Sequence, residues 1–255
     1  SHNRPMSSTA PLISVVIPAK NEEQSLPAAL DALNSQVGLD RTLYEVIVVD
    51  NNCTDRTAEI AKSLGAIVVK EPKPGIGHAR AAGFAIAKAP LIATTDADSI
   101  APESWLNDIL AAFNDPKVVA VGGPVTYDIS GEVLHAVVNR SIPYLHEIDR
   151  LIHADAYHLI GANMAVRKTA FDHIGGWHAE LSLGEDMDLS HRIAKVGKIA
   201  FLPDNRVKTS DRRFQTVGPQ QLIIYLGNYI ELTKPGDAVR KQLESFIERI
   251  RNQEK

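Results

Sequence analysis

Two aspartates at the end of an apolar run, Asp96 and Asp98, are the residues of this 255-residue sequence whose type and spacing most directly indicate chemistry. The run at residues 91–95 has the composition of a buried strand, which would bring both side chains to the rim of a sheet. Alternate strand residues point the same way, so the carboxylates would converge if the backbone stays extended. Paired carboxylates favour a cation, and hard oxygen ligands select Mg²⁺ or Mn²⁺. The alternative is a plain turn, because Asp is common where strands end.

The overall composition is that of a globular protein, with 44% hydrophobic and 23% charged residues. A net charge of −4 provides no electrostatic footprint for nucleic acid, so we expect none as a partner. Cys53 is the only cysteine, which excludes an intrachain disulfide and fits a reducing compartment. No stretch has the apolar length of a membrane span, and residues 1–10 do not resemble a signal peptide. These features together predict a cytoplasmic protein.

The first half of the chain alternates between strand and helix patterns, which predicts a mostly parallel sheet with helices on both faces. In such sheets ligands bind outside the carboxyl ends of the strands. Three polar loops of this sequence directly follow predicted strands and are therefore expected at that edge. The predicted strands are residues 12–17, stopped by Pro18, then 44–50, 66–69 and 91–95; the predicted helices are 26–33, capped by Ser25, then 57–64, capped by Thr54 or Asp55, and 78–88; the loops are 18–22, 50–55 and 96–98.

The second half of the chain does not continue this alternation of strands and helices. An acidic cluster, Glu185, Asp186 and Asp188, opens a helix, where helix capping is the simplest explanation because the dipole favours acids in a first turn. The other predicted helices are residues 102–113, 132–153, 169–174, 219–232 and 237–250, and the predicted strands are 118–125, 159–166 and 199–202.

Four blocks, at residues 15–23, 48–55, 95–98 and 184–189, give the sequence a resemblance to the family 2 glycosyltransferases of the GT-A fold. The resemblance covers about 200 residues, and the ordered set is more specific than any block alone. It implies an α/β GT-A fold with a Rossmann-like central sheet, mostly parallel and flanked by helices. The implied division is a flexible tail at 1–10, a glycosyltransferase domain at 11–218 and a C-terminal helical extension at 219–255; within the domain, 11–99 is the nucleotide-sugar half and 100–218 the acceptor half.

The resemblance also implies a nucleotide-diphosphate sugar donor and residues that bind it. Arg80 follows a glycine-rich stretch near a predicted helix start, where it would meet phosphate; the alternative is a solvated surface arginine. Asp55 could belong to the base pocket, although helix capping explains it equally well. Uridine is the commonest donor base in this family, with GDP- and dTDP-sugars as alternatives. The nucleotide-binding residues carried over are Pro18, Ala19, Glu22, Asp50, Arg80, Asp96 and Ala97.

The implied chemistry is transfer to an acceptor hydroxyl with a divalent metal, Mn²⁺ or Mg²⁺. Asp98 is the expected direct ligand, with Asp96 a second ligand or a ribose contact. Asp186, beside Glu185, resembles the general base, which would deprotonate the acceptor as it attacks the anomeric carbon. Such a single displacement inverts the configuration. The acceptor would be a saccharide or a lipid-linked saccharide.

Two features depart from the family pattern or have two explanations. Many members carry a metal-reaching His after the last strand, but residues 207–213 contain none; their basic residues, Lys208, Arg212 and Arg213, could meet phosphate from a closing lid, or form a solvated face. Trp177 could stack on a sugar, while core packing is the simpler role.

Three alternative functions follow from the same residues. A sugar nucleotidyltransferase would need a glycine-rich loop after the first strand, and residues 18–22 contain no glycine. A non-catalytic nucleotide-sugar-binding module and a retaining transferase would keep the same acids. An apolar stretch at 220–232 could contact the inner face of a membrane or a second subunit, but packing on its own domain is the simpler use.

Overall fold

The computed structural model describes residues 10–128, 159–181 and 184–210. The predicted helices at 132–153, 219–232 and 237–250 lie outside the described residues, as does the predicted C-terminal extension at 219–255.

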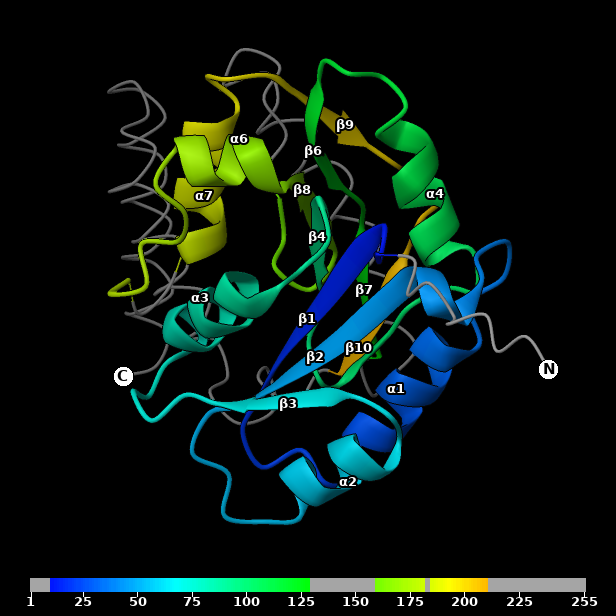
Figure 1. The fold of residues 1–255 in the computed structure, drawn as a ribbon, viewed down its shortest axis with the longest axis vertical. Helices are drawn as coiled ribbons and strands as arrows, with labels where there is room; N and C mark the ends of the chain where they lie inside the picture. The colour runs from blue at the N-terminus through cyan, green and yellow to red at the C-terminus, as the bar shows by residue number, and fades with distance from the viewer. Residues whose placement is uncertain (1–9, 129–158, 182–183, 211–255) are drawn as a thin grey trace, which may run out of the picture.

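A seven-stranded sheet forms the centre of the molecule (Figure 1). Only β8 runs antiparallel to its neighbours among these described strands, so the prediction of a mostly parallel sheet is confirmed. The strand order is β3 (Ile67–Lys70), β2 (Tyr44–Asp50), β1 (Ile13–Ala19), β4 (Leu91–Thr94), β8 (Met164–Arg167), β6 (Val118–Gly122) and β9 (Lys198–Phe201).

The first four strands form as the sequence pattern predicts, because each is a short apolar run joined to the next by a helical crossover. The crossovers are α1 (Leu26–Asn34), α2 (Thr57–Ser63) and α3 (Ile76–Ile86). Two details differ from prediction. Pro18 lies inside β1 rather than ending it, at a point where β4 has already stopped pairing. Ser25 precedes α1 but makes no side-chain capping bond.

Helices cover both faces of the sheet (Figure 1). One face packs on α1, α2 and α4 (Trp105–Ala112), through side chains such as Leu30 and Trp105. The other face packs on α3, α6 (Lys168–His173) and α7 (Glu185–Ile193), through Phe84 and Leu189. Alternation of side chains along each strand gives each face its own apolar core.

A small second sheet, which the sequence analysis did not predict, contains β5 (Ser99–Ile100), β10 (Val207–Ser210) and β7 (Val125–Asp128). β10 corrects the expectation that residues 199–202 form the last strand, since residues 207–210 pair with both other strands of this sheet. A 3-10 turn, η1 (Arg41–Leu43), precedes β2.

The predicted strand at 159–166 is shorter than expected. Gly161 and Ala162 form a turn closed by a bridge between Ile160 and Asn163, and β8 begins only at Met164. Since β8 runs antiparallel, its first residue pairs with Thr94 at the end of β4. The turn containing Gly161 is thereby placed at the carboxyl edge of the parallel strands.

Candidate active site at the carboxyl edge of the sheet

The ends of β1 and β2 form the first part of this edge. Ala19 and Asp50 are register partners, and the Ala19 carbonyl accepts a hydrogen bond from the Asn51 backbone N–H at 2.9 Å. The Asp50 carboxylate is buried and accepts from the Cys53 N–H at 2.9 Å. Pro18, Ala19 and Asp50 therefore lie together, as the parallel register requires.

Asn51 is a buried organiser of this edge that the sequence analysis missed. Its amide donates to the carbonyls of Glu71 at 2.9 Å and Lys73 at 2.7 Å, and its Oδ1 accepts from the Gly75 N–H at 2.9 Å. Asn51 thus ties the end of β2 to the loop before α3. An Asn directly after a strand that ends in Asp was the available signal, since Asn side chains bond nearby backbone.

Asp55 acts as a helix cap, the second of the two roles left open for it. Its Oδ1 accepts from the Thr57 backbone N–H at 3.0 Å and from the Thr57 hydroxyl, while its Oδ2 accepts from the Glu23 N–H at 3.1 Å. Glu22, in the same loop, donates its N–H to the Thr57 hydroxyl at 2.8 Å. Glu22 is therefore held beside the start of α2 by its backbone.

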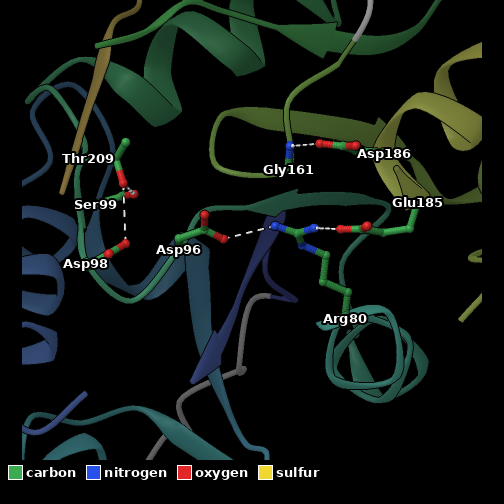
Figure 2. Close-up of polar contacts among 8 residues, drawn as sticks. All are labelled: Arg80, Asp96, Asp98, Ser99, Gly161, Glu185, Asp186 and Thr209. Atoms are coloured by element: carbon green, nitrogen blue, oxygen red, sulfur yellow. Dashed lines mark hydrogen bonds and ion pairs between the residues drawn. The ribbon is translucent and has the colours of Figure 1, made fainter. Parts of the chain in front are cut away.

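The two aspartates after β4 do not converge as predicted. The strand ends at Thr94, and residues 97 and 98 form a turn, so the extended backbone that convergence requires is absent. Asp96 contacts Arg80, whereas the Asp98 carboxylate accepts from the Thr209 hydroxyl at 3.3 Å (Figure 2). The Ser99 hydroxyl in turn donates to Thr209 at 2.9 Å. Asp96 and Asp98 are both partly exposed, while Ala97 between them is buried.

Arg80 differs most from expectation. It lies past the first turn of α3, and its side chain is buried, with only 2% of the residue exposed, so the interpretation as a solvated surface arginine is wrong. Nη2 donates to Asp96 Oδ1 at 2.9 Å and Nη1 donates to Glu185 Oε1 (Figure 2). Burial acts against the charged guanidinium, but the carboxylates of Asp96 and Glu185 outweigh it and raise the pKa of Arg80.

The acidic start of α7 lies on the opposite side of Arg80 from Asp96. Glu185 is buried, and burial raises the pKa of its carboxyl group against the opposing effect of Arg80. Asp186 Oδ2 accepts from the Gly161 backbone N–H at 3.0 Å, and its Oδ1 accepts from the Met187 N–H at 2.9 Å. Asp96, Arg80 and Glu185 thus form one chain of charges, and Gly161 holds Asp186 beside it.

Trp177 packs in the core, as the simpler of its two predicted roles requires. The residue is 7% exposed, and its ring centroid lies 5.3 Å from that of Phe84 and 6.1 Å from that of Phe171. Arg80 Cζ lies 5.7 Å from the centre of the Trp177 ring. The Trp177 ring therefore packs against the Arg80 guanidinium.

The remaining candidate groups are a cysteine, two arginines and any cluster of metal-binding side chains. Cys53 is partly buried, and burial raises the pKa of its thiol, so it is not activated. Arg212 and Arg213 lie outside the described residues. Within the described ranges, no group of three or more His, Cys, Asp or Glu side chains is arranged to hold a metal ion. In the same part of the chain, no helix has the length and apolar character that crossing a bilayer needs.

The chain belongs to glycosyl transferase family 2, because the model of that family matches residues 14–175. It is 48% identical over 110 residues to an uncharacterized glycosyltransferase of Mycobacterium tuberculosis, a match that covers 43% of this chain and 47% of the relative. It is 30% identical over 210 residues to the probable glycosyltransferase YdaM of Bacillus subtilis, covering 76% of this chain and 49% of YdaM. The chain thus spans about half the length of these two relatives.

Solved structures show the same fold. The mannosyltransferase PcManGT from Pyrobaculum calidifontis, in complex with GDP-Man and Mn²⁺, matches with a TM-score of 0.65 and 21% identity, over 90% of this chain and 68% of that one. Staphylococcus aureus TarS 1–349 in complex with UDP-GlcNAc matches with a TM-score of 0.63 and 22% identity, over 78% and 58%. Both are glycosyltransferase structures, so the predicted GT-A fold is confirmed.

Proposed function

We propose that this protein transfers a sugar from a nucleoside diphosphate donor to an acceptor hydroxyl, with a divalent metal and with inversion. The observation that carries the proposal is the charge chain of Asp96, Arg80 and Glu185, which brings the acids after β4 beside the acids that open α7. The first acids lie in the proposed nucleotide-sugar half, 11–99, and the second in the proposed acceptor half, 100–218. A site of this kind needs both sets at one edge of one sheet.

The donor class is supported by the relatives and by the edge residues. Solved neighbours of this fold hold GDP-Man or UDP-GlcNAc. In this chain, Pro18, Ala19, Glu22 and Asp50 would contact base and ribose at the ends of β1 and β2. Asp96 and the Ala97 backbone would contact the ribose or the diphosphate.

The acids after β4 fit a hard divalent cation. Asp96 and Asp98 are partly exposed carboxylates on one turn, and Mg²⁺ is commonly held by one or two carboxylates plus substrate phosphates. Asp98 would be the direct ligand, because Asp96 is paired with Arg80 and the two carboxylates do not converge. The diphosphate and water would supply the remaining oxygens. When bound, the ion would neutralise the negative charge of the departing nucleoside diphosphate.

Asp186 is the proposed general base. It is partly exposed, while two backbone N–H groups fix the direction of its carboxylate. In the proposed step, an Asp186 oxygen takes the acceptor proton as the acceptor oxygen attacks the anomeric carbon, and the bond from that carbon to the diphosphate breaks on the opposite face. General-base catalysis is worth about 10²–10⁴-fold.

A thermal-shift panel tests the donor and the metal together. UDP, GDP, dTDP and CMP are each tested with and without Mn²⁺ on the wild type, on Asp98→Ala and on Asp172→Ala. A ligand at about 100 times its Kd stabilises by about 2.7 kcal/mol. We expect one nucleotide to stabilise only with Mn²⁺, and only Asp98→Ala to lose the effect. Asp172 is the matched control because it is exposed on α6, at the other edge of the sheet. No shift with any nucleotide would overturn the proposal.

Transfer assays with the donor so identified test Asp186. Asp186→Asn is expected to lower transfer by about 10²–10⁴-fold while the donor Kd stays close to wild type. The anomeric proton coupling of the product reports the stereochemistry. Normal turnover by Asp186→Asn would remove this residue from the mechanism, and a retained configuration would replace inversion with a retaining reaction.

A further inference from the structure

The Arg80 side chain is fully committed inside the protein. It reaches from α3 to the turn after β4, through Asp96, and to the start of α7, through Glu185 (Figure 2). Its side chain is 3% exposed, and its Nε is buried without a hydrogen-bond partner among the described residues. A phosphate would have to displace one of the two carboxylates to reach this guanidinium, which leaves that carboxylate without its cation.

Gly161 lies directly against the same guanidinium. A Cβ atom at this position would come within 2.2 Å of Arg80 Nη2 and 2.3 Å of Cζ, so a larger residue would force the guanidinium away from its place between Asp96 and Glu185. The backbone N–H of Gly161 donates to Asp186 Oδ2 at 3.0 Å. The peptide that fixes the proposed base is therefore packed on the arginine that fixes its neighbour, Glu185.

We propose that Arg80 is a positioning residue that holds Glu185 and Asp186 at a set place relative to Asp96, and that it is not a ligand of the donor diphosphate. The inference rests on the proposed function for its catalytic consequence, while the packing it describes is independent of that function. It replaces the role implied by family resemblance, in which this arginine faces the nucleotide.

The electrostatics support a permanent cation at this place. Arg80 is buried between two carboxylates, Asp96 on one side and Glu185 on the other, and Asp186 follows Glu185 in the first turn of α7. Arginine suits the position because its planar fork can bond two carboxylates from two nitrogens at once, which a lysine ammonium does with less directional control. Substitution by Lys should therefore keep the charge and lose part of the alignment.

A comparison of catalysis with donor affinity tests the proposal. Arg80→Lys and Arg80→Met are assayed for kcat and for the Kd of the nucleoside diphosphate identified by the thermal-shift panel. Misplacing a reacting group by about 1 Å can cost about 10²-fold. We expect kcat to fall by about that factor in Arg80→Met and less in Arg80→Lys, with Kd changed by less than about threefold in both. A Kd that rises tenfold or more, or an unchanged kcat, would overturn the proposal.

A glycine substitution cycle tests the packing without any donor. Thermal unfolding is measured for Gly161→Ala and Arg80→Met, alone and combined. The atoms that an alanine at 161 would meet belong to the Arg80 guanidinium, which Met lacks. We expect Gly161→Ala to lower Tm by several degrees in the wild type and by much less when Met is at position 80. Simple additivity would overturn the positioning contact.

Control variants distinguish a failure of the Arg80–Gly161 contact from a failure of the proposed function. Gly83→Ala would bring a Cβ within 2.3 Å of a Val16 methyl, so Arg80→Met should not relieve it. If Arg80→Met does not fold, the cycle is run with Arg80→Met/Glu185→Gln, which removes the cation together with one acid. The cycle measures thermal unfolding, so it gives a result even if no nucleotide binds. In that case the proposed function fails, while the contact between Arg80 and Gly161 is still tested.

Discussion

Single side chains at the carboxyl edge often serve two segments at once, and Asp55 is one example. Its two oxygens accept N–H groups from Thr57, at the start of α2, and from Glu23, in the loop after β1. Burial acts against the ionised carboxylate, but the hydrogen bonds from Thr57 and Glu23 outweigh it and hold its pKa below the usual range. Stability and loop order are therefore linked through one carboxylate.

Asp55→Ala is expected to lower the free energy of unfolding by about 1 kcal/mol at neutral pH, the typical loss for a helix cap. Because the folded pKa is depressed, this contribution is complete above the unfolded pKa, near 3.9, and is lost as pH falls through the lower folded pKa. Urea unfolding of the wild type and of Asp55→Ala at pH 7 and at pH 3 measures both values. The difference between the proteins should shrink at pH 3, and a constant difference would contradict the charged cap.

Cys53 gives a second prediction at this scale. Burial raises the pKa of its thiol, and its Sγ lies 3.4 Å from the Asn21 N–H and the Ala19 carbonyl oxygen. We expect iodoacetamide to modify the folded protein at pH 8 more slowly than the same protein in urea, because less thiolate forms and access is reduced. Cys53→Ser provides the unreactive control. Equal rates in both states would show that the thiol is freely available.

At the scale of elements, a buried amide network centred on Asn163 joins segments that lie far apart in the chain. Asn163 Oδ1 accepts from Trp105 Nε1 at 2.8 Å, and Asn163 Nδ2 donates to the carbonyls of Pro124 at 3.0 Å and Asn205 at 2.7 Å. The network therefore links α4, the turn before β8 and the segment before β10. It had no signal in the sequence beyond an Asn in a short apolar stretch.

Asn163→Ala is expected to reduce the free energy of unfolding by about 3 kcal/mol, because it leaves the Trp105 indole N–H and the Asn205 carbonyl without this partner, at about 1–3 kcal/mol each before relaxation. The Pro124 carbonyl keeps its bond from the Val207 N–H at 3.1 Å. Urea unfolding monitored by circular dichroism measures the loss. The exposed Asn114→Ala is the matched control and should change stability by less than about 0.5 kcal/mol. A similar effect of both substitutions would assign no special role to the network.

The elements differ in how far local sequence determines them. β1, β2 and α1 were predicted within about two residues, because apolar runs and helical periodicity are local signals. β5 and β10 were missed, since Ile100 and Lys208 are ordinary residues alone and become strand residues only by pairing with distant parts of the chain. The strand predicted to reach back to residue 159 was wrong because the turn at Gly161 interrupts it.

In the candidate site too, some positions follow from local sequence and others depend on contacts made only in the folded protein. The positions of Pro18, Asp50 and Asp96 followed from strand ends and from the parallel register. The burial of Arg80 did not follow, because its partner Glu185 is 105 residues away in the chain and the contact exists only in the folded protein. The contact of Asp98 with the Thr209 hydroxyl was not predicted for a related reason, since Thr209 belongs to a strand that the sequence did not indicate.

At the scale of the whole molecule, the central sheet is shared by two apolar cores. Val15 and Ile17 of β1 belong to the core beneath α1 and α4, while Val16 between them belongs to the core beneath α3 and α7. Loss of either core exposes one face of the shared strands, which destabilises the sheet on which the other core packs. The cores should therefore unfold together, even though helices from distant parts of the sequence cover them.

The two tryptophans of the chain report on one core each, which makes this expectation measurable. Trp105 is fully buried on the face of α4, and Trp177 is 7% exposed on the face of α3 and α6. In Trp177→Phe the fluorescence follows the first core, and in Trp105→Phe it follows the second, while far-ultraviolet circular dichroism follows the whole fold.

Urea midpoints from fluorescence and circular dichroism should coincide within each variant, because a shared sheet couples the cores into one transition. Trp105→Phe is expected to unfold at lower urea than Trp177→Phe, since it also removes the indole N–H that donates to Asn163 at 2.8 Å. That difference between variants leaves the comparison within each variant intact. A fluorescence midpoint separated from the circular dichroism midpoint by more than about 0.5 M would show that one layer of helices leaves the sheet before the other.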